Sequence, residues 1–219
     1  MVDYPGKVSA VFFTSGCNFS CGYCHNKPLI DRSKKGLSFR QLHDAILKFK
    51  SRDWVTGVVI TGGEPTIWKN LPDLVQFCKS YGLSVKLDTN GSNPDLLESL
   101  MPVLDYVAMD VKGAPSQYLS LAKFDNLSPI EKSLRLLIAG KLPYEFRTTV
   151  IADFHTDGDL RAMAEWVRGA KRFVFQPFIP QHDLPDESLR NNPRTSSSTL
   201  MEAARILRKT VDEVIVRGA

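Results

Sequence analysis

Residues 84–111, SVKLDTNGSNPDLLESLMPVLDYVAMDV, contain a strand, a helix and a second strand. The two predicted strands, Ser84–Asp88 and Tyr106–Val111, are short runs in which β-branched, aromatic and other apolar residues dominate. Between them, Asn93 supplies a residue that commonly caps the start of a helix. Two strands joined through a helix run parallel and are connected by a right-handed crossover. This segment therefore predicts a parallel sheet.

The same alternation of strand and helix extends in both directions along the 219-residue chain. Most of the predicted strands are nearly continuous apolar runs, as expected for strands that are covered on both faces. The other predicted strands are Val8–Thr14, Gly57–Thr61, Glu145–Ile151, Arg172–Gln176 and Glu213–Arg217. The helices between the strands have capping signals at their starts, at Ser38, Asn70, Asn93, Ser128, Thr156 and Thr199.

Six strand–helix units followed by a short final strand fit two architectures, a β/α barrel and a doubly wound open sheet. A complete eight-unit barrel typically needs about 250 residues. The chain is shorter than that, so we predict an α/β fold with a partial (β/α)6 parallel barrel. No Gly/Ser linker divides the sequence, which predicts a single domain over residues 1–219. Residues 180–198 are expected to form a long loop, and residues 199–219 a C-terminal helix and strand.

Composition and charge exclude several classes of protein. Apolar residues make up 43% of the chain and charged residues 24%, which excludes a disordered or fibrous protein. The net charge is only +4, with 28 basic and 24 acidic side chains well mixed, so no nucleic-acid partner is expected. No apolar run approaches the roughly 18 residues of a membrane span, and no secretory signal is evident. We therefore expect a cytoplasmic protein without a membrane partner.

Three of the four cysteines, Cys17, Cys21 and Cys24, lie within eight residues after the first predicted strand. Structural zinc usually takes four ligands, and the fourth cysteine, Cys78, lies on the apolar face of a predicted helix. Three thiolates on a four-iron cube would leave one iron open, which is typical of a catalytic site. A zinc site completed by His25, a Cys21-x-x-Cys24 redox pair and a chance cluster are the alternatives.

Other unusual residues follow the ends of the predicted strands. The second strand ends in residues 61–65 (Thr-Gly-Gly-Glu-Pro), the third in residues 88–91 (Asp-Thr-Asn-Gly), and the fourth in residues 109–112 (Met-Asp-Val-Lys). Each segment alone has an ordinary explanation, such as a tight turn or an ion pair. However, the carboxyl ends of parallel strands meet at one edge, where ligands bind. The coincidence of these segments predicts one shared site that also includes the cysteines.

Four segments, the first of which contains the cysteine motif, resemble those of the radical S-adenosylmethionine enzymes. The segments are residues 2–26 (VDYPGKVSAVFFTSGCNFSCGYCHN), 57–66 (GVVITGGEPT), 85–94 (VKLDTNGSNP) and 106–113 (YVAMDVKG). Within that family the chain is most similar to the glycyl-radical-enzyme activases, in particular to those of anaerobic ribonucleoside-triphosphate reductase. The resemblance covers roughly residues 1–180.

The resemblance implies roles for individual residues. Cys17, Cys21 and Cys24 would hold one [4Fe–4S] cluster, whose fourth iron would bind the amino and carboxylate groups of S-adenosylmethionine. A monovalent cation would lie near two aspartates of the site. No catalytic residue is expected beyond the cluster and its ligand. The expected cofactor contacts are Tyr23 at the adenine, Gly62, Gly63 and Glu64 at the methionine ammonium, Asp88, Thr89, Asn90, Asp110 and Lys112 around the ribose and methionine, and Arg147 at the methionine carboxylate. The two aspartates are Asp88 and Asp110.

The resemblance also implies an activity and partners. An external one-electron donor such as flavodoxin or ferredoxin would reduce the cluster, and S-adenosylmethionine would be cleaved to methionine and a 5′-deoxyadenosyl radical. That radical would abstract a hydrogen atom from a glycine of a partner enzyme, anaerobic ribonucleotide reductase.

Three alternatives remain open at this point. One is the same radical chemistry on a small molecule or an RNA base, another is a non-catalytic iron–sulfur electron carrier, and the third is a zinc-binding interaction module. Some relatives place a histidine after the sixth strand, where this chain has Gln176, so cofactor contact at that position is left open.

Overall fold

The computed structural model describes residues 3–31, 33, 36–50 and 55–218. Its seven strands form one parallel sheet in the order β1-β2-β3-β4-β5-β6-β7. The bounds of every strand lie within one residue of those predicted, which confirms the strand predictions. The strands are β1 Ser9–Thr14, β2 Gly57–Gly62, β3 Ser84–Thr89, β4 Tyr106–Asp110, β5 Tyr144–Val150, β6 Arg172–Pro177 and β7 Glu213–Val216.

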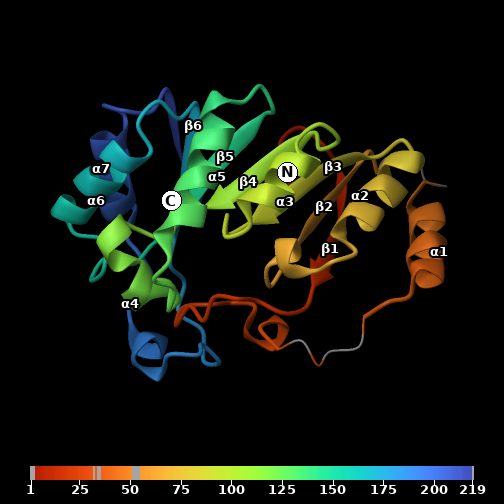
Figure 1. Ribbon diagram of the computed structural model, residues 1–219. Coiled ribbons are helices and arrows are strands. Elements are labelled where there is room, and N and C mark those ends of the chain that lie inside the picture. The colour runs from red at the N-terminus through yellow and green to blue at the C-terminus, as the bar shows by residue number, and fades with distance from the viewer. Residues whose placement is uncertain (1–2, 32, 34–35, 51–54, 219) are drawn as a thin grey trace.

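Helices connect the successive strands. Figure 1 shows α2, α3 and α5 in front of the strands, with α6 and α7 at the β6 side and α1 at the opposite side. The α-helices are α1 Phe39–Lys50, α2 Leu71–Ser80, α3 Pro94–Leu100, α4 Tyr118–Ala122, α5 Leu127–Ala139, α6 Asp157–Trp166 and α7 Ser197–Leu207. Short 3-10 helices are η1 Lys27–Leu29, η2 Pro65–Ile67, η3 Pro115–Gln117 and η4 Glu187–Asn191.

The strand order decides between the two predicted architectures. A doubly wound sheet reverses its direction of winding at a switch point, so that strands distant in sequence become neighbours. Here each strand pairs with the next strand in the sequence from β1 to β7, so every crossover moves the chain the same way. Within the described residues, β1 and β7 remain the two edges of the sheet. The partial parallel barrel is therefore confirmed, with a seventh, short strand at its end.

Three of the predicted helix caps are present. Ser38 Oγ accepts the Gln41 N–H, Asn93 Oδ1 accepts the Leu96 N–H, and Thr156 Oγ1 accepts the Asp159 N–H. These bonds satisfy backbone donors that have no partner within the first turn of a helix. Two of these caps, Ser38 and Thr156, are followed three residues later by Gln or Asp, whereas Asn93 is followed by Leu96. Ser128 and Thr199 are followed three residues later by Glu but do not cap their helices, so this spacing alone does not identify a cap in this chain.

Three other cap predictions differ from the structure. Asn70 occupies the cap position of α2 but makes no capping bond with its side chain. Ser128 lies inside α5, whose first helical residue is the one before it. Thr199 lies inside α7, whose cap is Ser196, with Oγ accepting the Thr199 N–H at 3.1 Å. Five consecutive hydroxyl residues, 195–199, compete for this role, so the sequence alone does not identify the cap.

The two faces of the sheet differ in chemistry. On the outer face, side chains such as Ile60, Leu87 and Phe146 are fully buried beneath the helices. On the inner face, the same strands carry charged side chains, among them Asp88 and Arg147. The expectation of strands apolar on both faces is therefore wrong for the inner face. The physical reason is that this face borders a polar cavity instead of a second layer of helices, so the strands alternate with a period of two.

Two further sequence predictions concern single features. Cys78 lies in α2 and is 0% exposed within the apolar core, as predicted. In the described part of the chain, no helix combines the length and the apolar character that crossing a membrane requires.

Candidate active site

A cavity of about 310 Å³ opens at the carboxyl ends of the strands. Its walls come from the loop after β1 and from the ends of β2 to β6. The structure brings every predicted site residue to this one cavity. These residues are Cys17, Cys21, Tyr23, Cys24, Gly62, Gly63, Glu64, Asp88, Thr89, Asn90, Asp110, Lys112 and Arg147. Their binding roles remain predictions, but their meeting in one place is a property of the fold.

The loop that carries the cysteines is held by main-chain hydrogen bonds. Gly16 adopts φ +91°, a left-handed conformation that favours glycine, and starts the loop. The Gly16 N–H donates to the Leu29 carbonyl at 2.7 Å, and the Cys17 N–H donates to the Ile30 carbonyl at 3.2 Å. The Glu64 N–H donates to the Gly16 carbonyl at 2.8 Å, which fixes the loop to the end of β2. These main-chain hydrogen bonds define the path of the loop.

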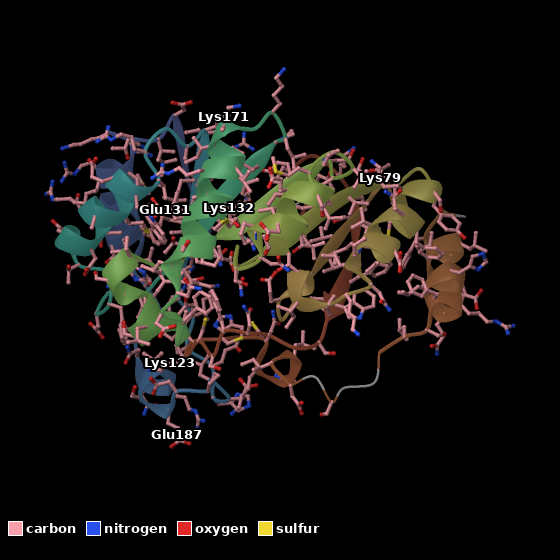
Figure 2. All side chains as sticks on the ribbon, in the orientation of Figure 1. Lys79, Lys123, Glu131, Lys132, Lys171 and Glu187 are labelled. Carbon is pink, nitrogen blue, oxygen red and sulfur yellow. The ribbon has the colours of Figure 1, made fainter. Side chains whose placement is uncertain are left out.

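Two other segments flank the cysteine loop. The Ser20 N–H donates to the Ala122 carbonyl at the end of α4, and the Asp186 N–H donates to the Gly22 carbonyl. Figure 2 labels Lys123, the residue after Ala122, at the same end of the molecule as η4. The long loop before α7 thus packs directly on the cysteine motif. The hydrogen bond from Asp186 to Gly22 joins residues 180–198 to the loop that carries the cysteines.

The three thiols are held in a partly desolvated environment. Cys21 is 8% exposed, and Cys17 and Cys24 are half-buried. The Phe19 N–H donates to Cys17 Sγ at 3.4 Å, a bond that favours the thiolate. Burial raises the pKa of all three thiols, that of Cys21 to about 11, while the Lys112 ammonium opposes the rise. Because metals bind the thiolate, metal binding here would release protons.

The donor set fits an iron–sulfur cluster. Among the described residues, no three Cys, His, Asp or Glu side chains form a site for a single metal ion. A [4Fe–4S] cluster takes each thiolate at a different iron, so it needs cysteines spaced around a cavity. Cys17, Cys21 and Cys24 meet that requirement because all three line the same cavity. Three thiolates would leave one iron of such a cluster without a protein thiolate, and polar side chains line the same cavity.

Charged side chains of the inner face pair with one another inside the cavity. Arg147 lies between two carboxylates, donating to Asp88 Oδ2 at 3.1 Å and to Asp110 Oδ1 at 2.9 and 3.0 Å. Asp88 Oδ1 accepts from Lys86 Nζ at 2.5 Å. Asp110 Oδ2 accepts from Lys112 Nζ at 3.0 Å. We call this group the inner-face charge cluster. It carries one excess positive charge, because it contains three cations and two anions, namely Lys86, Lys112, Arg147, Asp88 and Asp110.

The pKa shifts within the inner-face charge cluster follow from burial and pairing. Burial alone would raise the pKa of Asp110, but Lys112 and Arg147 outweigh it and lower the pKa to about 2. For Lys86, burial dominates and lowers the pKa, while the Asp88 carboxylate opposes the change. A largely buried group with an excess positive charge favours an anionic ligand, such as a carboxylate.

Glu64 links the end of β2 to the end of β3. Its side chain is 1% exposed, and both carboxylate oxygens accept hydrogen bonds. Oε1 accepts from the Thr66 N–H at 3.0 Å, the Thr66 hydroxyl at 2.6 Å and the Thr89 hydroxyl at 2.7 Å. Oε2 accepts from the Asn90 N–H at 2.6 Å. Burial raises the pKa of Glu64, and these hydrogen bonds oppose the rise.

We expect Glu64→Gln to lower the free energy of unfolding of the metal-free protein by about 1–3 kcal/mol, because an amide N–H₂ cannot accept the bond now made by Oε2. Denaturant unfolding measures this difference. The control is Glu131→Gln on α5, whose exposed side chain makes only a 3.8 Å ion pair with Arg135, and we expect a change below about 0.5 kcal/mol. Equal effects of the two substitutions would contradict the linking role of Glu64.

Seven further residues of the cavity were not assigned a role from the sequence. Among them, Gln176 Nε2 donates to Thr149 Oγ1 at 2.9 Å, so two uncharged polar side chains lie next to Arg147 on the β5–β6 side of the cavity. Thr149 lies two residues after Arg147 on the same strand, so both side chains are on the same face of the sheet. The alternation of side chains along a strand therefore predicts that Thr149 faces the cavity together with Arg147. The seven residues are Phe19, His25, Asn26, Ile30, Thr61, Thr149 and Gln176.

The comparisons with known proteins agree with this site. Residues 11–167 match the family model described as the Radical SAM superfamily, and the chain belongs to this superfamily. A relative in Methanocaldococcus jannaschii is 33% identical over 224 residues, which cover 99% of this chain and 91% of the relative. That relative carries the provisional name of a glycyl-radical enzyme activating enzyme, and the predicted activase branch is thereby supported.

Other similar proteins share the superfamily and the fold. A 7-carboxy-7-deazaguanine synthase of Thermococcus kodakarensis is 25% identical over 186 residues, 76% of this chain and 72% of that protein. The crystal structure of Streptococcus suis SuiB bound to S-adenosylmethionine matches 97% of this chain with a TM-score of 0.76 at 12% identity. This chain covers 51% of the SuiB chain, and the match shows the fold alone. Membership of the superfamily implies a [4Fe–4S] cluster and S-adenosylmethionine, and the chain is an enzyme of this kind.

Proposed function

We propose that this chain activates a glycyl-radical enzyme, that the partner is an anaerobic ribonucleotide reductase, and that a flavodoxin or ferredoxin supplies the electron. The observation that supports the proposal most strongly is the meeting of all thirteen predicted residues around one cavity. The relative that shares nearly the full length of the chain carries the name of an activating enzyme, which supports the same activity. The partner and the donor rest on the resemblance of the four sequence segments.

In this proposal Cys17, Cys21 and Cys24 hold the cluster. When bound, the reduced cluster supplies the electron that cleaves S-adenosylmethionine into methionine and a 5′-deoxyadenosyl radical. The three cysteines that would hold the cluster line the same cavity as the charged side chains of the inner face. Tyr23, which is 8% exposed and lines the cavity between two of the cysteines, offers an aromatic surface for the adenine.

The other wall of the cavity binds and orients the methionine group. Lys112 and Arg147 provide the excess positive charge that a carboxylate needs. The glycines Gly62 and Gly63 have no side chains, so their carbonyl groups can approach an ammonium closely. Both carboxylate oxygens of Glu64 are already bonded. In this proposal Glu64 holds the end of β3 through these bonds, and Oε2, which accepts a single hydrogen bond, also receives the methionine ammonium.

A protein substrate requires access to the cavity. The sheet ends at two unpaired edges within the described residues, β1 and β7, so the barrel is open along one side. A peptide loop is an extended chain about 5 Å wide in the plane of a sheet, and it can enter from such a side. The proposal requires that a glycine-bearing loop of the partner reach the cavity from that side.

Two measurements test the proposal. The protein is reconstituted anaerobically, reduced and mixed with S-adenosylmethionine, and 5′-deoxyadenosine is assayed by chromatography. The candidate reductase is then added, and a glycyl radical is sought by electron paramagnetic resonance. The control is a reductase whose radical-site glycine is replaced by alanine. We expect cleavage in the first experiment and a radical only with the unaltered reductase in the second.

Each negative result points to one of the alternatives. Cleavage without a glycyl radical would support an enzyme that acts on a small molecule or an RNA base, the kind of activity found in the deazaguanine synthase relative. No cleavage by a sample that contains the complete cluster would overturn both enzyme functions for this cavity. It would favour the iron–sulfur electron carrier.

A further inference from the structure

The monovalent cation expected near Asp88 and Asp110 does not fit the structure. Each of the four carboxylate oxygens already accepts a hydrogen bond from a cationic side chain. The guanidinium of Arg147 fills the space between the two carboxylates. An alkali ion binds through such oxygens, and here none of the four is left without a charged partner.

Lys86 is the least expected member of the inner-face charge cluster. It is 1% exposed, one of the largest fully buried side chains of the protein. It lies in β3 two residues before Asp88, so both side chains point to the inner face. Its ammonium is 2.5 Å from Asp88 Oδ1. The other charged groups that act on it are Arg147 and Glu145, the latter fully buried in β5.

A buried lysine is energetically costly unless its charge is paired. Glu145 is already engaged in a bidentate ion pair with Arg217, at 2.7 and 3.0 Å, which leaves Asp88 as the partner of Lys86. An ammonium on a four-carbon chain is a compact single positive charge. Lys86 thus brings to Asp88 the same charge as an alkali ion, from a side chain that cannot dissociate.

We propose that Lys86 takes the place of the monovalent cation, so that this chain binds S-adenosylmethionine without an alkali ion. Lys86 is then a positioning residue. It neutralises Asp88 and holds the carboxylate against Arg147, and Arg147 in turn faces the ligand. The proposal rests on the proposed binding of S-adenosylmethionine in this cavity.

The first experiment uses the unaltered, reconstituted protein. The affinity for S-adenosylmethionine is measured by equilibrium dialysis in potassium, sodium and choline chloride at the same ionic strength. We expect the three dissociation constants to agree within about twofold, a difference of less than about 0.5 kcal/mol. An affinity that rises with potassium or sodium but not with choline would overturn the proposal.

The second experiment removes the ammonium by Lys86→Met. In choline, we expect the variant to lose about tenfold or more in affinity, since one charge-assisted hydrogen bond to Asp88 is lost. We expect potassium or sodium to restore most of the loss, because the freed carboxylate oxygen can now bind the ion. Lys132→Met is the matched control, since Lys132 is exposed and pairs only with Asp95 on the surface. A Lys86→Met protein whose affinity for S-adenosylmethionine is the same in choline, potassium and sodium would overturn the proposal.

A readout without S-adenosylmethionine separates this proposal from the proposed function. Sodium NMR line broadening is recorded with metal-free protein. We expect broadening with Lys86→Met, reversed by potassium, and none with the unaltered chain. Lys86→Leu, which likewise has no donor for Asp88, replaces the methionine variant if the latter does not fold. Failure of every protein to bind S-adenosylmethionine in all three salts would overturn the proposed function, and sodium broadening by the unaltered chain would overturn the role of Lys86.

Discussion

Replacing Cys21 with alanine is expected to abolish cluster binding while the chain remains folded. Cys21 is the most buried of the three clustered thiols, at 8% exposure, and it lies in the middle of the motif. Two remaining thiolates cannot hold a four-iron cluster whose fourth corner has no protein ligand. Iron and acid-labile sulfide are measured after anaerobic reconstitution, and far-ultraviolet circular dichroism monitors the fold. We expect less than a tenth of the iron bound by the unaltered protein, about the level of adventitious binding.

The matched control is Cys78→Ala. Cys78 is a free thiol that is 0% exposed in α2, inside the apolar core and outside the cavity. Removing its sulfur leaves a small void, with a cost of about 1–2 kcal/mol in unfolding free energy. The cluster content is expected to equal that of the unaltered protein. A folded Cys78→Ala protein without a cluster would show that the assignment of the fourth cysteine is wrong.

Replacing Gly63 with alanine is expected to disrupt the site without touching any cysteine. A methyl group at Gly63 would lie 2.0 Å from the Gly16 carbonyl oxygen, 2.6 Å from its carbon and 2.9 Å from the Leu29 oxygen. All three atoms belong to the main chain, so no side chain can rotate away. Either β2 or the cysteine loop must move, and the 2.8 Å hydrogen bond between Glu64 and Gly16 is lost.

We expect Gly63→Ala to lower the free energy of unfolding by about 1–3 kcal/mol, the usual cost of overpacking, and to reduce the bound iron strongly. Gly158→Ala in α6 is the control. A methyl group there meets only the Thr156 hydroxyl at 3.7 Å, an ordinary contact. Alanine also suits a helix better than glycine, so the control is expected to be as stable as the unaltered chain or more so. Full cluster content in Gly63→Ala would contradict the close approach of the two loops.

The strands and the location of the site were predictable because the signals for them are local. A run of β-branched and aromatic residues marks a strand wherever the strand finally lies. The carboxyl ends of parallel strands meet at one edge by geometry, so the residues after Thr61, Asp88 and Asp110 had to converge. The position of the cysteines directly after β1 placed them at the same edge. No information on strand register was needed for these conclusions.

The pairing of the charged residues was not predictable, because it depends on register. Asp110 lies directly opposite Arg147 in the parallel pairing of β4 with β5. Arg147 reaches Asp88 across 59 positions of sequence. The sequence indicated that Asp110 and Lys112 share a face, and the same rule applied to Lys86 would have placed that lysine beside Asp88. A lysine is commonly expected to be exposed, so the sequence alone does not indicate that Lys86 is buried beside the carboxylate of Asp88.

The contrast between the two faces of the sheet has a consequence for how such a scaffold can diversify. The free energy gained from burying apolar groups comes mainly from the layer between strands and helices, where residues such as Phe146 and Leu87 lie. The inner face contributes ion pairs, whose exchange in matched sets costs little apolar area. Substitutions can therefore change the residues that line the cavity while the apolar layer between strands and helices stays unchanged. The same fold can then support different reactions without a loss of stability.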